Sequence, residues 1–287
     1  MELGNSSERG SVEDRRGSKK PLAIGGGIGA VVIALIAGYL GIDPQIAQQV
    51  VNQGGGGETR GTGKEDGYKD FSEKLLGSTN SVWNEQFKKN QYRNFRGSYQ
   101  EPKMVIFSDR VDSEGCGMAP SAVGPFYCPA SKKVFLDPTF FDELESKLGG
   151  SKAAFSQAYV IGHEVGHHVQ NLLGYDVTPE MQRRDGKDNA GIRQELQADY
   201  LAGVWAHHAK DKLKINSDDI AAALKTARSI GDNRIQEKMK GKSWPESFNH
   251  GRDDQRLKYF KQGFETGDAS ERALDRFFDR NVKPLEL

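Results

Sequence analysis

The sequence predicts an α+β fold, mostly helical with a small antiparallel sheet and preceded by one transmembrane helix. Short apolar runs typical of strands lie early in the chain and long helical patterns follow them, an order that favours α+β over alternating α/β. Residues 21–42 are apolar, carry no charge and are long enough to cross a bilayer. We find no internal repeat, so the part after this segment is expected to be one domain.

The composition agrees with this class and excludes others. The chain has 287 residues, of which 36% are hydrophobic and 28% charged, so it can build a core and is not wholly disordered. Its 40 basic and 40 acidic residues give no net charge, which argues against nucleic acid as a partner. Two cysteines are too few for a disulfide scaffold or a thiolate zinc cluster.

The charges around residues 21–42 predict how this segment lies in a membrane. Four basic residues precede it and Asp43 follows it, so the positive-inside rule makes residues 1–20 a cytoplasmic tail. We therefore expect a single-pass anchor in the inner (cytoplasmic) membrane, in contact with lipid, with the following domain periplasmic or extracellular. A cleaved signal peptide is the alternative, but the stretch is long and lacks a clear cleavage site.

Small residues recur every fourth position in the expected span, from Gly26 to Gly38. Such a stripe could pair two copies of the chain as a homodimer, although small residues are also simply common in spans. Residues 43–66 are polar and Gly-rich and predict a flexible linker. The domain is therefore expected to occupy residues 67–287.

Cys116 and Cys128 lie on the expected exported side, where a disulfide can form. The bridge would close a loop of about a dozen residues, worth about 3 kcal/mol in the chain-entropy treatment. We predict this disulfide, with two buried free thiols as the alternative.

Periodicity and caps place the elements of the domain. A helix is expected over residues 68–90, followed by strands at 104–107, 126–128 and 134–136, the last two as a hairpin. Asp137 and Pro138 open a helix that stops at Gly149, and Ser151 caps the next one, which ends at Gly174. Further helices are expected at 190–213, 217–230, 252–264 and 270–278.

The helix before Gly174 contains an H-E-x-x-H motif, made by His163, Glu164 and His167. Residues four apart share a helix face, so the two imidazoles can converge on one ion. Glu164 is rotated by about 100° from His163, which suits it to reach a metal-bound water as a general base. The motif predicts a catalytic metal site.

Two imidazoles leave a zinc site incomplete, because catalytic zinc usually has three protein ligands and an open position. Glu195 and Asp199 are again four apart, on a helix whose small residues allow a close approach to a neighbour. One carboxylate can bind the metal while the other accepts the free ring N–H of a ligand histidine. A solvated acidic pair on a surface helix is the alternative.

These motifs give the sequence a family resemblance. HEVGH followed by ELQAD, behind one apolar N-terminal segment, resembles the bacterial neutral zinc metallopeptidase family, and the arrangement is that of the gluzincin class of zinc peptidases. The resemblance covers most of the chain and implies a zincin-like metallopeptidase domain with Zn²⁺ as cofactor and a peptide or protein as substrate. It implies that His163, His167 and Glu195 are the zinc ligands, Glu164 the general base and Asp199 the residue that orients a ligand histidine.

The charge that develops on a carbonyl oxygen usually meets a second stabiliser besides the metal. His250, just before a helix, is the best-placed candidate by context, and Tyr159, Tyr175 and Tyr200 are others. An extended peptide could add as a strand at the edge of the hairpin. We expect the remaining histidines, His168, His207 and His208, to be structural or solvated, and Gly162 and Gly166 to allow close helix packing.

The leading hypothesis is thus a membrane-anchored zinc peptidase. A non-catalytic, zinc-stabilised envelope interaction protein is one alternative, but a purely structural site would prefer a fourth protein ligand and would not need Glu164. A zinc amidase acting on cell wall is another, and the absence of wall-binding repeats in the sequence makes it weaker.

Overall fold

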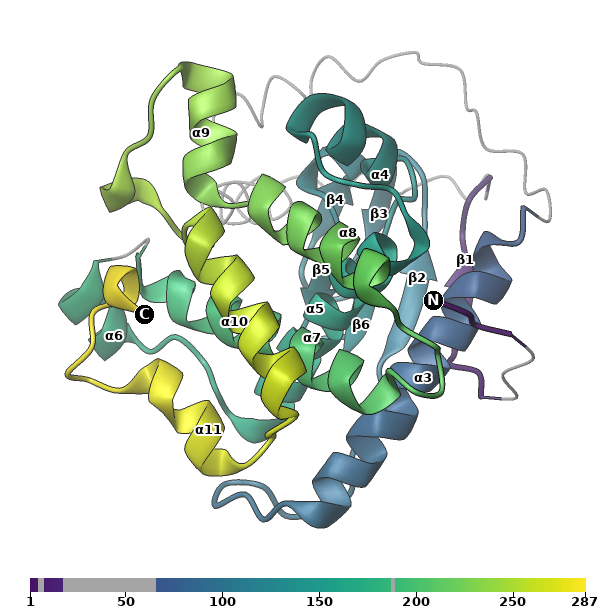
Figure 1. The fold of residues 1–287 in the computed structure, drawn as a ribbon, viewed down its shortest axis with the longest axis horizontal. Coiled ribbons are helices and arrows are strands. Elements are labelled where there is room, and N and C mark those ends of the chain that lie inside the picture. The colour runs from purple at the N-terminus through teal and green to yellow at the C-terminus, as the bar shows by residue number, and fades with distance from the viewer. Residues whose placement is uncertain (5–7, 18–65, 187–188) are drawn as a thin grey trace.

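Three helices form the centre of the structure, a computed structural model that describes residues 1–4, 8–17, 66–186 and 189–287. They are α5 (Ala154–Leu173), α7 (Ile192–Ala209) and α10 (Asp253–Thr266). α7 lies between the other two and packs against both (Figure 1). Large buried side chains, among them Trp83, Phe155 and Trp205, fill the spaces around this stack.

α7 and α10 touch backbone to backbone because glycines lie at their crossing. A Cβ added to Gly203 would stand 2.1 Å from the carbonyl oxygen of Phe260, and one added to Gly263 would stand 2.0 Å from that of Tyr200. No other residue fits at such a distance. The close crossing lets short side chains of α7 meet side chains of α10.

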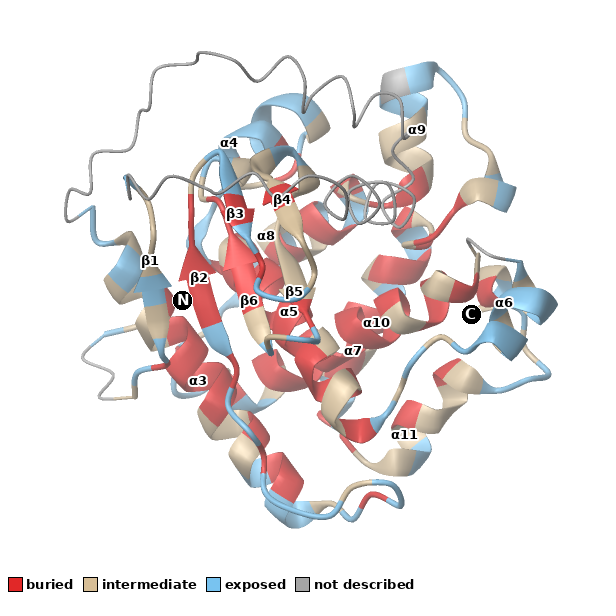
Figure 2. Ribbon diagram, turned by 180° about the vertical axis from the view of Figure 1, so that it is seen from behind, coloured by how far each residue is buried: buried red, intermediate tan, exposed pale blue. Residues whose placement is uncertain are grey.

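A four-stranded sheet covers the α5 side of the stack (Figure 2). Its strands, in spatial order, are β1 (Val12–Asp14), β2 (Lys103–Ile106), β6 (Lys133–Leu136) and β5 (Phe126–Cys128). β5 and β6 pair antiparallel, as expected for the hairpin, but β1–β2 and β2–β6 pair parallel. The sheet is mixed rather than antiparallel, because the chain crosses over between β2 and β6 and a strand from the N-terminal region joins β2.

The two faces of this sheet bury different cores, as the alternation of side chains along a strand requires. Met104, Val134 and Leu136 join the main core with the helices. Val105 and Phe135 point to the other face, where the two-stranded ribbon of β3 (Arg110–Asp112) and β4 (Met118–Pro120) supplies further apolar side chains. A disulfide between Cys116 and Cys128 ties the β3–β4 connection to the end of β5.

The remaining elements surround the central stack. They are α3 (Tyr68–Lys89), α4 (Phe140–Glu143) with a π-helical turn (Leu144–Leu148), α6 (Pro179–Asp185), α8 (Ser217–Ser229), α9 (Asp232–Lys240) and α11 (Glu271–Asp275). The long helices agree with the expected ranges to within a few residues, whereas β1, β3, β4, α6 and α9 were not expected. The expected cap at Ser151 is wrong: α5 begins at Ala154 with Ala153 as N-cap, and the Ser151 hydroxyl accepts the Ala153 amide, which lies before the helix.

Residues 8–17 pack on the domain. β1 hydrogen-bonds to β2, and the guanidinium of Arg16 bonds to Asp14 and Asp66. A Cβ on Gly77 of α3 would stand 2.6 Å from the carbonyl oxygen of Glu8, so the two backbones touch. Two of the four basic residues of the expected positive-inside flank, Arg15 and Arg16, are thus partners of carboxylates, while Lys19 and Lys20 lie outside the described residues.

No helix in the described ranges is long and apolar enough to cross a membrane. The expected anchor, residues 21–42, lies outside the described residues, as does the linker up to residue 65. The stripe of small residues expected to pair two spans lies outside them as well.

Candidate metal centre

α5 presents two imidazoles to the same side. His163 and His167 are one turn apart, and their ring centroids are 4.7 Å from each other. Nearly all of α5 is buried, between the sheet on one side and α7 on the other. The His163 ring is therefore buried, and the His167 ring is partly buried.

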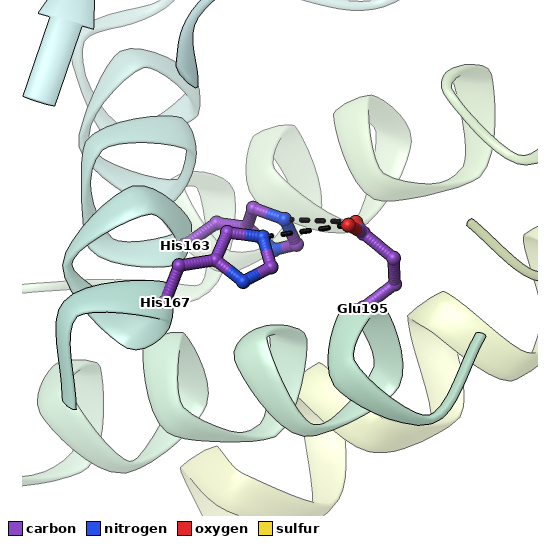
Figure 3. Close-up of side chains that lie close together, drawn as sticks. All are labelled: His163, His167 and Glu195. Atoms are coloured by element: carbon purple, nitrogen blue, oxygen red, sulfur yellow. Dashed lines mark hydrogen bonds and ion pairs between the residues drawn. The ribbon is translucent and has the colours of Figure 1, made fainter. Parts of the chain in front are cut away.

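Glu195 of α7 faces both rings across the gap between the helices (Figure 3). Its Oε2 lies 3.2 Å from His163 Nε2, and its Oε1 lies 3.4 Å from His167 Nε2. Zinc bonds of about 2.0–2.1 Å in a tetrahedron put neighbouring ligand atoms roughly 3.3–3.4 Å apart. The donor atoms and their spacing thus fit a zinc ion held by His163, His167 and Glu195, the group of possible ligands found in the described part of the chain.

The far nitrogens of both rings are held by hydrogen bonds. His163 Nδ1 is 2.9 Å from Asp199 Oδ1, and His167 Nδ1 is 2.8 Å from Gln170 Oε1. Because these oxygens can only accept, each Nδ1 carries the proton. Each Nε2 is then oriented toward Glu195, as expected for ligand histidines fixed by a second layer of residues.

The charges around His163 attract cations. Burial works against a proton on the ring, but Asp199 and Glu195 outweigh it and raise the pKa of His163 to about 10. Burial likewise opposes the negative charge of Asp199 and of Glu195. Arg256 and His163 nevertheless hold the pKa of Asp199 below its ordinary value, and His167 and His163 hold the pKa of Glu195 well below its ordinary value. A divalent cation would replace the proton on His163.

Glu164 lies beside this group and has a different environment. Its side chain is buried, and burial raises its pKa above the ordinary value. A carboxylate with a raised pKa is a stronger proton acceptor than one in water. The two glutamates thus differ in environment: the histidines lower the pKa of Glu195, whereas burial raises the pKa of Glu164.

His250 lies close enough to Glu195 for the carboxylate to act on its pKa. Its Nδ1 is 3.0 Å from Asp232 Oδ1, and the other Asp232 oxygen accepts the amides of Asn249, His250 and Gly251. Burial opposes protonation of His250, but the Asp232 charge outweighs it and raises the pKa. Asp232 thus fixes both the loop and the ring.

The three tyrosines considered as alternatives have other partners. The hydroxyl of Tyr159 donates to Asp199, that of Tyr175 to Asp275 and that of Tyr200 to the Asp268 carbonyl. The remaining histidines also bond within the fold. His168 bonds to Tyr127 and Gln100, His207 to the Phe264 carbonyl and His208 to the Gly267 carbonyl.

Three residues of the centre escaped the sequence analysis: Gln170, Asp232 and Arg256. Gln170 is three residues after His167 on the same helix, so the i, i+3 spacing could have indicated it. Asp232 and Arg256 reach the centre from α9 and α10. No local pattern connects them to their partners, because Asp232 is 18 residues from His250 and Arg256 is 57 residues from Asp199.

A helical H-E-x-x-H motif joined by a glutamate from a second helix defines a zinc-peptidase type of centre. A family model described as "Putative neutral zinc metallopeptidase" matches residues 1–274, and the chain belongs to this family. YpfJ of Escherichia coli (strain K12) is 36% identical over 280 residues, 92% of this chain and 95% of YpfJ. Rv2575 of Mycobacterium tuberculosis (strain ATCC 25618 / H37Rv) is 42% identical over 182 residues, 60% of this chain and 61% of that protein. No solved structure matches.

Proposed function

We propose that this protein is a zinc-dependent peptidase in which Glu164 is the general base for hydrolysis of a peptide bond. The observation that carries the proposal is that Glu195 faces both imidazoles of a helix that also buries Glu164 at the same place. Family membership supports zinc as the metal. The group provides three protein ligands, whereas structural zinc sites use four, so a coordination position is left for substrate or water.

Zinc, when bound, lowers the pKa of a coordinated water to about 7 and polarises a carbonyl oxygen. Glu164 accepts the proton released during attack on the carbonyl carbon and then passes it to the leaving amine. His250, oriented by Asp232, donates a hydrogen bond to the carbonyl oxygen as negative charge develops there. We assign this role to His250 because the Glu195 carboxylate acts on its ring, whereas the hydroxyls of Tyr159, Tyr175 and Tyr200 donate to Asp199, Asp275 and the Asp268 carbonyl.

The edge strand β5 supports an extended peptide as substrate. β5 is the last strand of the sheet in the described residues and packs against α5. Tyr127 of β5 bonds to His168 and receives a bond from Asn171, so the strand is fixed to the helix that carries the metal ligands. We propose that substrate lies along this edge, bound by its main chain.

We keep the membrane location as a proposal. Residues 21–42 have the length and composition of a membrane anchor. The disulfide favours an oxidising compartment for the domain, such as the periplasm or the cell exterior.

The test compares the full-length protein with Glu164→Gln. Both should bind one zinc ion per chain, because Glu164 is not among the ligands, whereas peptide hydrolysis should fall by about 10²–10⁴-fold or more when the base is removed. Zinc content is measured by elemental analysis and turnover with a mixed library of peptides.

Glu85→Gln, at an exposed position on α3, is the matched control and should leave turnover unchanged. Equal hydrolysis by wild type and Glu164→Gln would reject the mechanism, and no hydrolysis by wild type of any peptide would favour the interaction protein. Hydrolysis of cell-wall amides in place of peptides would identify the amidase.

A further inference from the structure

The carboxylate of Asp199, next to the metal ligands, accepts four hydrogen bonds from three side chains. It is fully buried. Its Oδ1 accepts hydrogen bonds from Tyr159 at 2.5 Å, His163 Nδ1 at 2.9 Å and Arg256 Nη2 at 3.0 Å. Its Oδ2 accepts from Arg256 Nε at 2.9 Å. The Arg256 guanidinium thus bonds to both oxygens of Asp199, while Oδ1 also bonds to the ligand His163.

The two-point contact with Arg256 fixes the orientation of the Asp199 carboxylate. A guanidinium is planar and presents its donors in a rigid fork, so a two-point contact stops Asp199 from rotating about its last bond. Oδ1 is then kept on the line to His163 Nδ1. Lysine could neutralise the charge but could not define the plane of the carboxylate.

Charge compensation adds a second reason for an arginine. An isolated buried carboxylate is costly and would take up a proton. His163 must be neutral to donate its Nε2 lone pair to a metal, so it cannot supply the compensating charge when a metal is bound. Arg256 is always charged and is itself buried, so it compensates Asp199 in either state.

We propose that Arg256 is a positioning residue of the metal centre: it acts through Asp199 to hold the His163 ring with Nε2 toward the metal. Its guanidinium bonds to both oxygens of Asp199 and to the Tyr159 hydroxyl. Because it comes from α10, it makes the metal affinity depend on the α7–α10 crossing. The inference rests on metal binding by this centre and not on peptidase activity.

The test measures zinc affinity, by competition with a chelator, for full-length Arg256→Lys and Arg256→Gln. Loss of such a residue typically lowers metal affinity by roughly 10–100-fold. Each variant should also change the visible spectrum of bound Co²⁺, because the His163 ring can tilt. Arg16→Lys is the matched control. The Arg16 guanidinium is also nearly buried and makes a two-point contact with a carboxylate, that of Asp14, outside the metal centre. This substitution should leave both readouts unchanged.

A double-mutant cycle separates positioning from general damage. If Arg256 acts through Asp199, Asp199→Asn combined with Arg256→Lys should lose no more affinity than Asp199→Asn alone. Additive losses, or wild-type affinity and spectrum in both Arg256 variants, would overturn the inference. Should Arg256→Gln fail to fold, Arg256→Lys and the cycle decide. A wild-type protein that binds no zinc would instead reject the metal centre itself.

Discussion

His168, next to a metal ligand, makes the domain sensitive to acid. Its Nδ1 accepts from the Tyr127 hydroxyl and its Nε2 donates to the Gln100 carbonyl, so both ring nitrogens are used by the neutral form. Burial lowers the pKa of His168 from 6.5 to about 4. Since the unfolded chain then binds this proton more tightly than the folded one, protonation favours unfolding.

We predict a loss of stability between pH 6.5 and pH 4 that depends on His168. The contribution of the neutral ring is complete above pH 6.5 and falls with pH until the folded-state pKa of about 4 is passed. The full effect is about 3 kcal/mol, of which roughly 2 kcal/mol is lost by pH 5. Urea unfolding with a chelator present, at pH 7 and pH 5, measures it for wild type and His168→Gln.

Comparing the two proteins at each pH cancels the contribution of the other histidines to the pH dependence of stability. His168→Gln should be less stable than wild type at pH 7, and the difference should shrink at pH 5. The same difference at both pH values would show that His168 does not titrate in this window.

The ligands themselves could be predicted from spacing, and their supports only in part. His163, His167 and the Glu195–Asp199 pair each follow a four-residue period, which fixes a shared helix face before any tertiary contact is known. Arg256 and Asp232 meet the centre only because α9 and α10 fold back on α7. Spacing along a helix predicts which residues share a face. The need of a zinc ion for a third ligand indicated that Glu195 faces the two histidines, and no comparable requirement indicated Arg256 or Asp232.

At the scale of elements, three glycines of the helical stack differ in what an added Cβ would contact. A Cβ on Gly203 would stand 2.1 Å from a backbone oxygen of α10, which cannot move without moving the helix. A Cβ on Gly162 would stand 3.1 Å from the edge of the Trp205 ring, which a small shift can relieve. Gly166 is intermediate, 3.0 Å from the carbonyl oxygen of Ala198. The close helix packing expected at Gly162 and Gly166 is present.

We predict that Gly203→Ala lowers the free energy of unfolding by about 3 kcal/mol or more, because overpacking against backbone is the costly case. Gly162→Ala should be nearly neutral, since alanine gains up to about 1 kcal/mol in helix propensity and offsets the tight contact. Urea unfolding of the metal-free proteins measures both. Equal effects of the two substitutions would mean that the α7–α10 crossing is looser than the structure has it.

The long helices, the strand β2 and the β5–β6 hairpin were predicted, whereas β1, β3, β4 and the parallel pairings were not. The helices at α3, α5, α7, α8 and α10 carry periodic apolar residues over several turns, and the β5–β6 hairpin is local. β1, β3 and β4 have three residues each, too few for a period. The parallel pairing of β2 with β1 and β6 joins distant segments, so no local signal could distinguish it from an antiparallel sheet.

At the scale of the whole molecule, the disulfide links the β3–β4 ribbon to the sheet. Cys116 and Cys128 are 12 residues apart, and closing such a loop is worth about 3 kcal/mol. We predict that replacing both by serine lowers the free energy of unfolding by about this amount and leaves zinc affinity unchanged, because both cysteines belong to the second core, on the other face of the sheet from the helices. Wild-type stability of the variant under oxidising conditions would show that the bond does not constrain the unfolded chain.

The pairing of β1 with β2 constrains the topology of the chain. Residues 8–17 are held to the domain by main-chain hydrogen bonds, by Arg16 and by ion pairs of Arg9 with Asp70 and Glu73. A strand cannot pair with a sheet across a bilayer. With β1 paired, residues 8–17 and the metal centre must lie on the same side of any membrane, which is incompatible with a single crossing by residues 21–42. We expect the paired arrangement, and a single-pass anchor would require β1 to detach.

Cysteine labelling in intact cells tests this expectation. Ser11→Cys places a thiol at an exposed position beside β1, and Lys88→Cys places one at an exposed position near the end of α3. A membrane-impermeant maleimide should react with both variants or with neither, because the two thiols share a compartment, and wild type supplies the blank since its cysteines are bonded. Labelling after lysis shows that each thiol is reactive. Labelling of one variant alone in intact cells would contradict the docked strand and restore a tail separated from the domain by the membrane.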